Sequence, residues 1–257
     1  MPTIELENVT KFYKVKKRRR GDKKIEVGVR NVDLTIQQGE FVFIIGSSGA
    51  GKSTLINLIG GRIKPNRGKV YVDHKDLSWM MKLSQNRTSL LFGKVLQEPT
   101  LIRSQTVEEN LLLAGRISAP KTENTQYTRA KAQKVLGLVG MRGSEKRYPP
   151  EMSIGECRRV ELARALISSP PVLILDEITA NLDDDSIWDL FQLLNEINRM
   201  GTTVIMVTHA SQYVNIMRRR VVTLVDGQIF GDVKKGRYGD VVERQLNGFS
   251  FYRTDLI

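Results

Sequence analysis

Alternating and continuous apolar stretches predict the strands of this chain. Residues 3–8 and 26–36 alternate apolar with polar side chains, which predicts a pair of half-buried strands. Short continuous apolar runs at 41–45, 172–175 and 204–207 instead predict strands buried on both faces, as in a parallel sheet. Further strands are expected at 69–73, 89–96 and 220–225, the last followed by an Asp226-Gly227 hairpin turn.

Helical patterns fill the middle of the chain, roughly residues 98–165. Thr106 and Glu109 form a T-x-x-E capping box, which marks the start of a helix. Apolar residues recur at helical spacing over 126–139, and again over 187–197, where they form the core face of a helix. Pro149-Pro150 marks a break. Strands that alternate with helices predict an α/β fold with a parallel sheet.

The strand at 41–45 runs into a glycine-rich stretch that fits G-x-x-x-x-G-K-[ST], a loop whose backbone amides cradle phosphates. Gly46 and Gly51 let the backbone approach the phosphates, Lys52 reaches them, and the Ser53 hydroxyl coordinates Mg²⁺. The bland alternative is a connector, but the buried strand before the loop and the helical pattern after it favour a phosphate site. The predicted site comprises Gly46, Ser47, Ser48, Gly49, Ala50, Gly51, Lys52, Ser53 and Thr54.

Three polar residues follow other predicted buried strands. Asp176 and Glu177 come after one of them, and His209 comes after another. Open α/β sheets bind ligands at the carboxyl ends of their strands, so we expect all three near the phosphates. Asp176 suits a second Mg²⁺ contact and Glu177 suits a base that orients the attacking water. Either motif alone would be an ordinary strand end; the phosphate loop makes the catalytic interpretation the better one.

Composition limits the class of protein. The chain has 257 residues, 40% of them hydrophobic and 26% charged, as in a globular protein of one large or two small domains. No apolar run approaches the ~18 residues of a membrane span, and the amino terminus lacks a signal-peptide pattern. We therefore expect a cytoplasmic location. One cysteine, Cys157, excludes an internal disulfide.

A net charge of +12, from 40 basic and 28 acidic residues, suits a partner that carries phosphates. Charge alone does not distinguish nucleic acid from the anionic surface of a membrane. Residues 14–24, KVKKRRRGDKK, concentrate this charge in what we interpret as a hairpin loop. The loop is either simply solvated or contacts a membrane surface or partner.

The order of these motifs resembles the nucleotide-binding subunits of ATP-binding-cassette (ABC) proteins. The segment Met152–Glu156 resembles the LSGGE signature of that family, Gln97 its glutamine loop, Asn181–Asp183 its D-loop and His209 its switch histidine. Tyr13 corresponds to the aromatic residue that stacks on adenine; the less favoured alternative, from residue type alone, is an aromatic residue at a strand end that packs on the core.

The resemblance implies an ABC ATPase domain: a RecA-like parallel sheet core with an antiparallel β subdomain and a helical signature subdomain. Its expected extent is residues 1–239, with the core lobe at about 1–97 and 166–239, and the helical subdomain at about 98–165.

It further implies a head-to-tail dimer that binds two ATP molecules with Mg²⁺. Each ATP would lie between residues 46–54 of one copy and Ser153, Gly155, Glu156 and Asp183 of the other. Ser53, Gln97 and Asp176 would hold Mg²⁺. Glu177 would act on water, with Gln97 and His209 at the γ-phosphate.

Within the family, the sequence of residues 176–229 most resembles the cell-division branch. Members of that branch work with an integral membrane subunit of permease type. This implies a peripheral position at the cytoplasmic face of the inner membrane. Lipoprotein-releasing and macrolide-export ATPases are the alternative. A soluble ABC protein acting on nucleic acid is a third class, disfavoured because the chain has a single cassette without a long coiled coil, so we expect no specific nucleic-acid partner.

Four residues depart from the family pattern: Ile154 stands for a glycine, Cys157 and Arg158 for glutamines, and Ile178 for a proline. These departures question the rate of hydrolysis rather than ATP binding. Cys157 is either a redox switch or an ordinary helix residue. Residues 240–257 form a carboxyl-terminal tail that either packs on the domain or does not.

Overall fold

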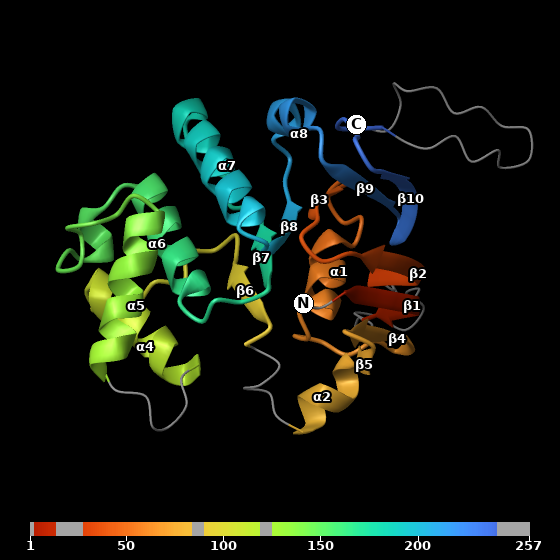
Figure 1. Ribbon diagram of the computed structural model, residues 1–257. Helices are drawn as coiled ribbons and strands as arrows, with labels where there is room; N and C mark the ends of the chain where they lie inside the picture. Colours follow the sequence, from red (N-terminus) through yellow and green to blue (C-terminus); the bar gives the residue numbers. More distant parts are fainter. Residues whose placement is uncertain (1–2, 14–27, 84–89, 119–124, 241–257) are drawn as a thin grey trace, which may run out of the picture. The chain divides into compact units, whose positions relative to one another are not determined.

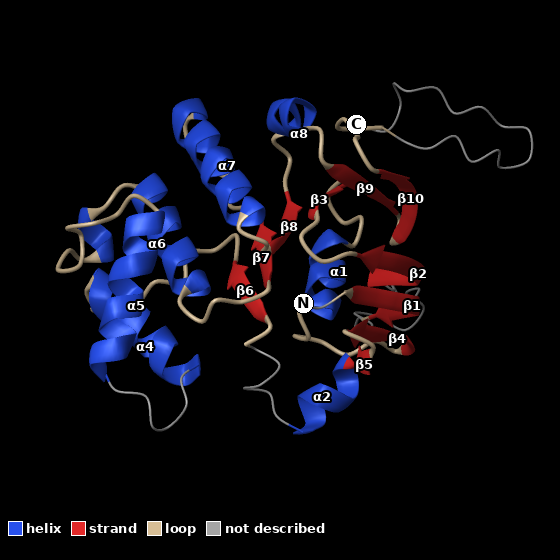
Figure 2. Cartoon of the chain, in the orientation of Figure 1, coloured by secondary structure: helices blue, strands red, loops and turns tan. Residues whose placement is uncertain are grey.

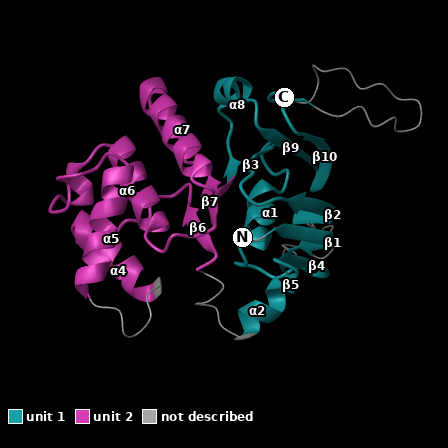
Figure 3. Ribbon diagram, in the orientation of Figure 1, with its two compact units in different colours: residues 1–83, 205–257 teal, residues 84–204 magenta. Residues whose placement is uncertain are grey.

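The computed structural model describes residues 3–13, 28–83, 90–118 and 125–240 (Figure 1), with helices and strands alternating along the chain (Figure 2). The chain divides into two compact units, residues 1–83 with 205–257 and residues 84–204 (Figure 3). The basic run 14–24 and nearly all of the tail lie outside the described residues, so the expectations for them stay predictions.

The first unit contains an antiparallel sheet with the strand order β2-β1-β4-β5. The predicted pair is confirmed: Ile4 lies opposite Ile36 and Leu6 opposite Leu34, all four buried. Alternation places one side chain in two on the core face, as the pattern predicted. The elements are β1 (Ile4–Phe12), β2 (Gly28–Ile36), β4 (Arg67–Val72) and β5 (Lys75–Asp76), followed by the helix α2 (Leu77–Leu83).

The same unit contains the parallel strands around the phosphate loop. β3 (Phe41–Ile45), buried at all five positions, pairs in parallel with β9 (Arg220–Val225). β9 turns at Asp226 and Gly227, both at positive φ, and pairs antiparallel with β10 (Gln228–Val233), which confirms the predicted hairpin. The remaining elements are α1 (Lys52–Ile59), β8 (Thr203–Val207, at the boundary of the two units along the chain) and α8 (Ser211–Met217).

The second unit is largely helical, and the stretch predicted to be helical, about residues 98–165, lies within it. Two strands, β6 (Phe92–Val95) and β7 (Val172–Asp176), pair in parallel. The helices α4, α5 and α6 pack on one another (Figure 2). The helical elements are α4 (Val107–Ser118), α5 (Thr125–Leu138), the 3₁₀ turn η1 (Pro149–Glu151), α6 (Ile154–Leu166) and α7 (Asp184–Arg199).

The capping box at Thr106 is confirmed, because the Thr106 amide donates to Glu109 Oε2 (2.7 Å) and the Glu109 amide to Thr106 Oγ1 (3.2 Å). Periodicity did not predict α2 and α8, which have seven residues each and are too short to show a period of 3.6. Among the described residues, no helix combines the length and the apolar content that crossing a membrane requires.

Candidate active site

In the turn from β3 into α1, the backbone passes so close to neighbouring carbonyl groups that a side chain would not fit at two positions. A Cβ at Gly46 (φ 149°) would lie 2.3 Å from the carbonyl oxygen of Leu224. A Cβ at Gly51 (φ 97°) would lie 2.7 Å from the carbonyl oxygen of Gly28. Positive φ and close approach together explain why both positions carry glycine.

Lys52, the first residue of α1, is only 6% exposed. Its Nζ donates to the carbonyl oxygens of Gly46 (2.8 Å) and Ser47 (2.9 Å), so the ammonium lies over the loop itself. The amino end of a helix carries partial positive charge. A buried cation beside that end makes the loop attractive to an anion such as a phosphate.

The outer residues of the loop face solvent. Ser47, Ser48, Gly49 and Ser53 are exposed, Thr54 is half-buried and Ala50 is buried. The ladder of α1 begins with the Leu55 amide, which donates to the Gly51 carbonyl (2.9 Å). The amides that precede it in the first turn point toward the loop, as in every helix, and form the cradle that a phosphate needs.

His209 follows β8 in the same unit and is exposed. Its Nδ1 lies 3.4 Å from the hydroxyl of Tyr238, whose amide donates to Asn215 Oδ1 in α8 (2.7 Å). Tyr238 is therefore placed to orient the imidazole. No local pattern in the sequence identified Tyr238 as part of a site.

Tyr13 is 40% exposed, and Lys11 Nζ lies 5.8 Å from its ring centroid. This exposure excludes the alternative of a core aromatic. An aromatic face at the surface suits stacking on a base.

In the second unit, β7 ends at Asp176, which is half-buried. Glu177 follows at φ 48°, a conformation uncommon for a residue with a side chain and concentrated at functional sites. Ile178 is fully buried, so this departure from the family's proline is accommodated by packing in the core.

Gln97 lies two residues beyond β6 and is exposed. β6 and β7 are parallel neighbours, with Val95 opposite Leu175, so Gln97 and Asp176 follow the strands at the same edge. This is the edge at which parallel sheets bind ligands. Two of the three predicted Mg²⁺ ligands therefore lie at the same edge of the two strands of the second unit.

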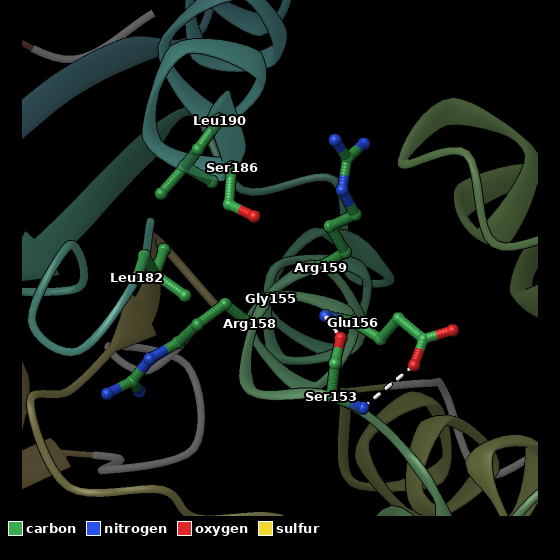
Figure 4. A pocket seen from close by; sticks show the side chains of 8 residues that line it. All are labelled: Ser153, Gly155, Glu156, Arg158, Arg159, Leu182, Ser186 and Leu190. Atoms are coloured by element: carbon green, nitrogen blue, oxygen red, sulfur yellow. Dashed lines mark hydrogen bonds between the residues drawn. The ribbon is translucent and has the colours of Figure 1, made fainter. Parts of the chain in front are cut away.

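The signature segment forms the amino end of α6. Ser153 Oγ accepts from the Glu156 amide (3.1 Å), and Glu156 Oε2 accepts from the Ser153 amide (2.8 Å), as Figure 4 shows. Because Ser153 caps the helix, α6 begins at Ile154. Arg147 Nη1 donates to Glu156 Oε1 (2.6 Å), and this bond is the main reason why the pKa of Glu156 is lowered.

A cavity of about 130 Å³ separates the start of α6 from the start of α7 (Figure 4). A Cβ at Gly155 would lie 3.4 Å from Ser186 Oγ across it. Ser186 donates its amide to Asp183 Oδ1 (2.8 Å), the cap of α7, and this bond lowers the pKa of Asp183. The signature and the D-loop therefore lie close together. The side chain of Ile154, which departs from the family's glycine, is 52% exposed and points outward.

The Cys157 thiol donates to the Pro149 carbonyl (3.5 Å) and is half-buried. Burial, and then the charges of Glu161 and Glu156, raise its pKa. Because the thiolate is the reactive form, these surroundings favour an ordinary helix residue over a redox switch.

The predicted site residues fall into both units. Residues 46–54, Tyr13 and His209 belong to the first unit. Gln97, Asp176, Glu177, the signature and Asp183 belong to the second. Over the described ranges, no three His, Cys, Asp or Glu side chains gather as a metal cluster.

Comparison with known proteins agrees with these motifs. A family profile described as ABC transporter matches residues 29–180. The cell division ATP-binding protein FtsE of Streptococcus pneumoniae is 38% identical over 242 residues, which cover 93% of this chain and 99% of that relative. The methionine import ATP-binding protein MetN of Vibrio cholerae is 35% identical over 240 residues, 93% of this chain and 66% of the relative.

Among solved structures, the dimeric ATP-binding cassette MJ0796, in a post-hydrolysis state bound to ADP and Pi, is similar. It superposes with a TM-score of 0.78 at 32% identity, covering 91% of this chain and 99% of that one. The phosphate loop, the capped signature and these matches lead to one conclusion. This chain belongs to the ABC transporter family and is one of its ATP-hydrolysing cassettes.

Proposed function

We propose that the chain is the ATPase subunit of a membrane complex of the cell-division type. Two copies would work with an FtsX-like integral membrane subunit and regulate peptidoglycan hydrolases. The observation that carries the ATPase activity is the buried Lys52 ammonium above a loop in which Gly46 and Gly51 leave no room for a Cβ. The observation that favours the cell-division branch is the FtsE match, which spans 99% of that relative.

ATP is the substrate, and it binds at residues 46–54. Backbone amides of the loop and Lys52 hold its phosphates, and Tyr13 stacks on adenine. On binding, Lys52 exchanges loop carbonyls for phosphate oxygens, which are stronger acceptors because they are charged. Most of the binding free energy therefore comes from contacts with the phosphates. The exposed Tyr13 adds an uncharged stacking contact with the base.

Mg²⁺ would be held by the Ser53 hydroxyl, the Gln97 amide oxygen and the Asp176 carboxylate, all oxygen donors of the kind that Mg²⁺ prefers. When bound, it neutralises charge that develops on the phosphates. Glu177 orients the attacking water and accepts its proton. His209, oriented by Tyr238, donates a hydrogen bond to the γ-phosphate, and Gln97 contacts the same group.

The second half of each site comes from another copy of the chain. Ser153, Gly155, Glu156 and Asp183 would face the ATP bound to residues 46–54 of the partner. The amino end of α6 is suited to this, because helix amides and the Ser153 hydroxyl favour an anion. Arg147 offsets the Glu156 charge that would otherwise repel phosphate. ATP would close the dimer and hydrolysis would open it.

The membrane partner places the complex at the cytoplasmic face of the inner membrane. Methionine import is less well supported, because the match spans only 66% of the MetN relative. Lipoprotein release and macrolide export remain outcomes of the test below.

The catalytic assignment is tested with Glu177→Gln. We expect kcat for ATP hydrolysis to fall by roughly 100-fold or more, because the base is lost while binding is kept. ATP with Mg²⁺ should then trap a dimer, visible by size-exclusion chromatography. Lys52→Ala is the control, in which ATP should produce neither turnover nor dimer. Full turnover in Glu177→Gln would contradict the role assigned to this residue.

The cellular assignment is tested by purifying the Glu177→Gln protein from membranes and identifying what co-purifies by mass spectrometry. A partner with four membrane-spanning helices and a large extracellular loop supports the cell-division role. An exporter or importer subunit in its place would replace that role with transport.

A further inference from the structure

One side of α6 carries three charged residues beyond the signature, at three-residue spacing: Arg158, Glu161 and Arg164. The first two are buried, with side chains 4% and 1% exposed, and form an ion pair at 2.7 Å. Two buried charges need a reason, because removing them from water costs free energy that the pair itself only partly returns.

Their partners are the backbone groups around Gln97. Arg158 donates through Nη1 to the Leu96 carbonyl (2.9 Å) and through Nη2 to the Gln97 carbonyl. Glu161 Oε1 accepts from the Thr100 amide (2.6 Å) and from its hydroxyl (3.1 Å). Arg164 donates to the Thr100 carbonyl (2.7 Å). Both ends of the segment 96–100 are thus bonded to one helix.

The strand that leads into this segment also lies against α6. A Cβ at Gly93 in β6 would lie 2.8 Å from the carbonyl oxygen of Ala165. The backbone of Gln97 therefore has a rigid support from its strand through Thr100, while its side chain is exposed. Ser153 caps the same helix, so the signature and Gln97 are carried by one element.

We propose that Arg158 and Glu161 are positioning residues that hold the segment 96–100 against α6 and so fix Gln97 for ATP hydrolysis. The proposal rests on the role proposed above for Gln97. An apolar pair would pack as well or better at these sites. It would not supply the directional bonds to two carbonyls and an amide.

The test is the double variant Arg158→Gln with Glu161→Ala, which removes both charges and leaves neither buried alone. We expect kcat to fall roughly tenfold or more, since small misplacement of an active-site group is costly. The KM for ATP should change little, because residues 46–54 hold the phosphates. Hydrogen exchange at the Thr100 amide should become faster. An unchanged kcat, or unchanged exchange, overturns the proposal.

A cycle with Gln97→Ala shows whether the effect passes through Gln97. The triple variant should be no slower than Gln97→Ala alone. Multiplying losses would mean that the ion pair acts elsewhere, and would overturn the proposal. If Gln97→Ala or Lys52→Ala retained full turnover, the proposed function itself would fail, which is a distinguishable result.

Two further variants serve as controls for this test. Arg129→Gln breaks an exposed ion pair with Glu108 between α4 and α5 (2.7 Å) and should leave kcat unchanged. Arg158→Lys keeps the charge but has one ammonium nitrogen in place of the planar guanidinium, so it does not reproduce the separate bonds of Nη1 and Nη2. It should therefore lower kcat in the same direction even if the double variant does not fold. Wild-type kcat in Arg158→Lys would then overturn the proposal.

Discussion

At the scale of single residues, several segments assigned to nucleotide chemistry contain backbone with positive φ. Gly46, Gly49 and Gly51 have positive φ in the phosphate loop, as have Glu177 after β7 and Asn181 in the D-loop. For residues with a side chain, this conformation costs free energy that surrounding structure must offset. The positive φ at Gly46 after β3 and at Glu177 after β7 therefore sets the direction in which the chain leaves these two strands.

Gly46 and Gly49 allow a matched test of close backbone approach. Both have positive φ, but a Cβ at Gly46 would meet the Leu224 carbonyl at 2.3 Å, whereas one at Gly49 would meet nothing within 4 Å. Gly49→Ala should lower the free energy of unfolding by about 1 kcal/mol from strain alone. Gly46→Ala should cost about 2–4 kcal/mol, since overpacking adds to strain.

Urea unfolding without nucleotide measures both values. Equal losses in the two variants would contradict the close approach of β9 to the loop.

At the scale of elements, three helices of the second unit begin with the same device, a carboxylate that accepts backbone amides. Glu109 serves α4, Glu156 serves α6 and Asp183 serves α7. The pKa of each carboxyl group is lowered. The main cause is a backbone hydrogen bond from Thr106 for Glu109, and the hydrogen bond from Arg147 for Glu156. For Asp183 it is a backbone hydrogen bond from Ser186.

These lowered pKa values predict how stability depends on pH. A carboxylate with a lowered folded-state pKa stabilises fully above its ordinary value, 4.5 for Glu and 3.8 for Asp. The contribution is lost as pH falls from the ordinary pKa through the lowered pKa. In this range the carboxylate of the unfolded state is protonated before that of the folded state, which favours unfolding. The urea midpoint should therefore decline below about pH 4.5.

The combined variant Glu109→Gln, Glu156→Gln and Asp183→Asn should show a shallower decline from a lower starting value. Glu196→Gln, an exposed change in the last turn of α7, is the control and should keep the wild-type slope. A slope unaltered by the triple change would mean that other groups control acid unfolding.

At the scale of the whole molecule, the charge of +12 remains the feature that ATP hydrolysis does not need. Each Lys or Arg near an anionic bilayer contributes about 1 kcal/mol to binding, and salt screens this attraction. The basic run 14–24 holds much of the excess, although it lies outside the described residues.

Replacement of Lys16 to Arg20 by Ser and Gln should therefore weaken binding to anionic vesicles by about tenfold or more. Co-sedimentation at low and high salt measures it, with neutral phosphatidylcholine vesicles as the control. Unchanged binding to anionic vesicles would leave the run as a solvated loop.

The sequence by itself determined most of the strands, the long helices and the phosphate loop. These are local: β3 is apolar at every position, α7 repeats its apolar face, and the loop motif needs glycines in a short span. Strand ends likewise predicted Asp176, Glu177 and His209 as site residues, because the carboxyl edge of a parallel sheet is where ligands bind.

Only the tertiary structure decided what surrounds these residues. Glu161 and Thr100 are 61 positions apart, and His209 and Tyr238 are 29 apart, so no local pattern relates them. From sequence, Arg158 was a departure from the family, and its burial beside Glu161 was not predictable. Whether a charge is buried depends on which distant segments cover it, and packing of the whole chain settles that.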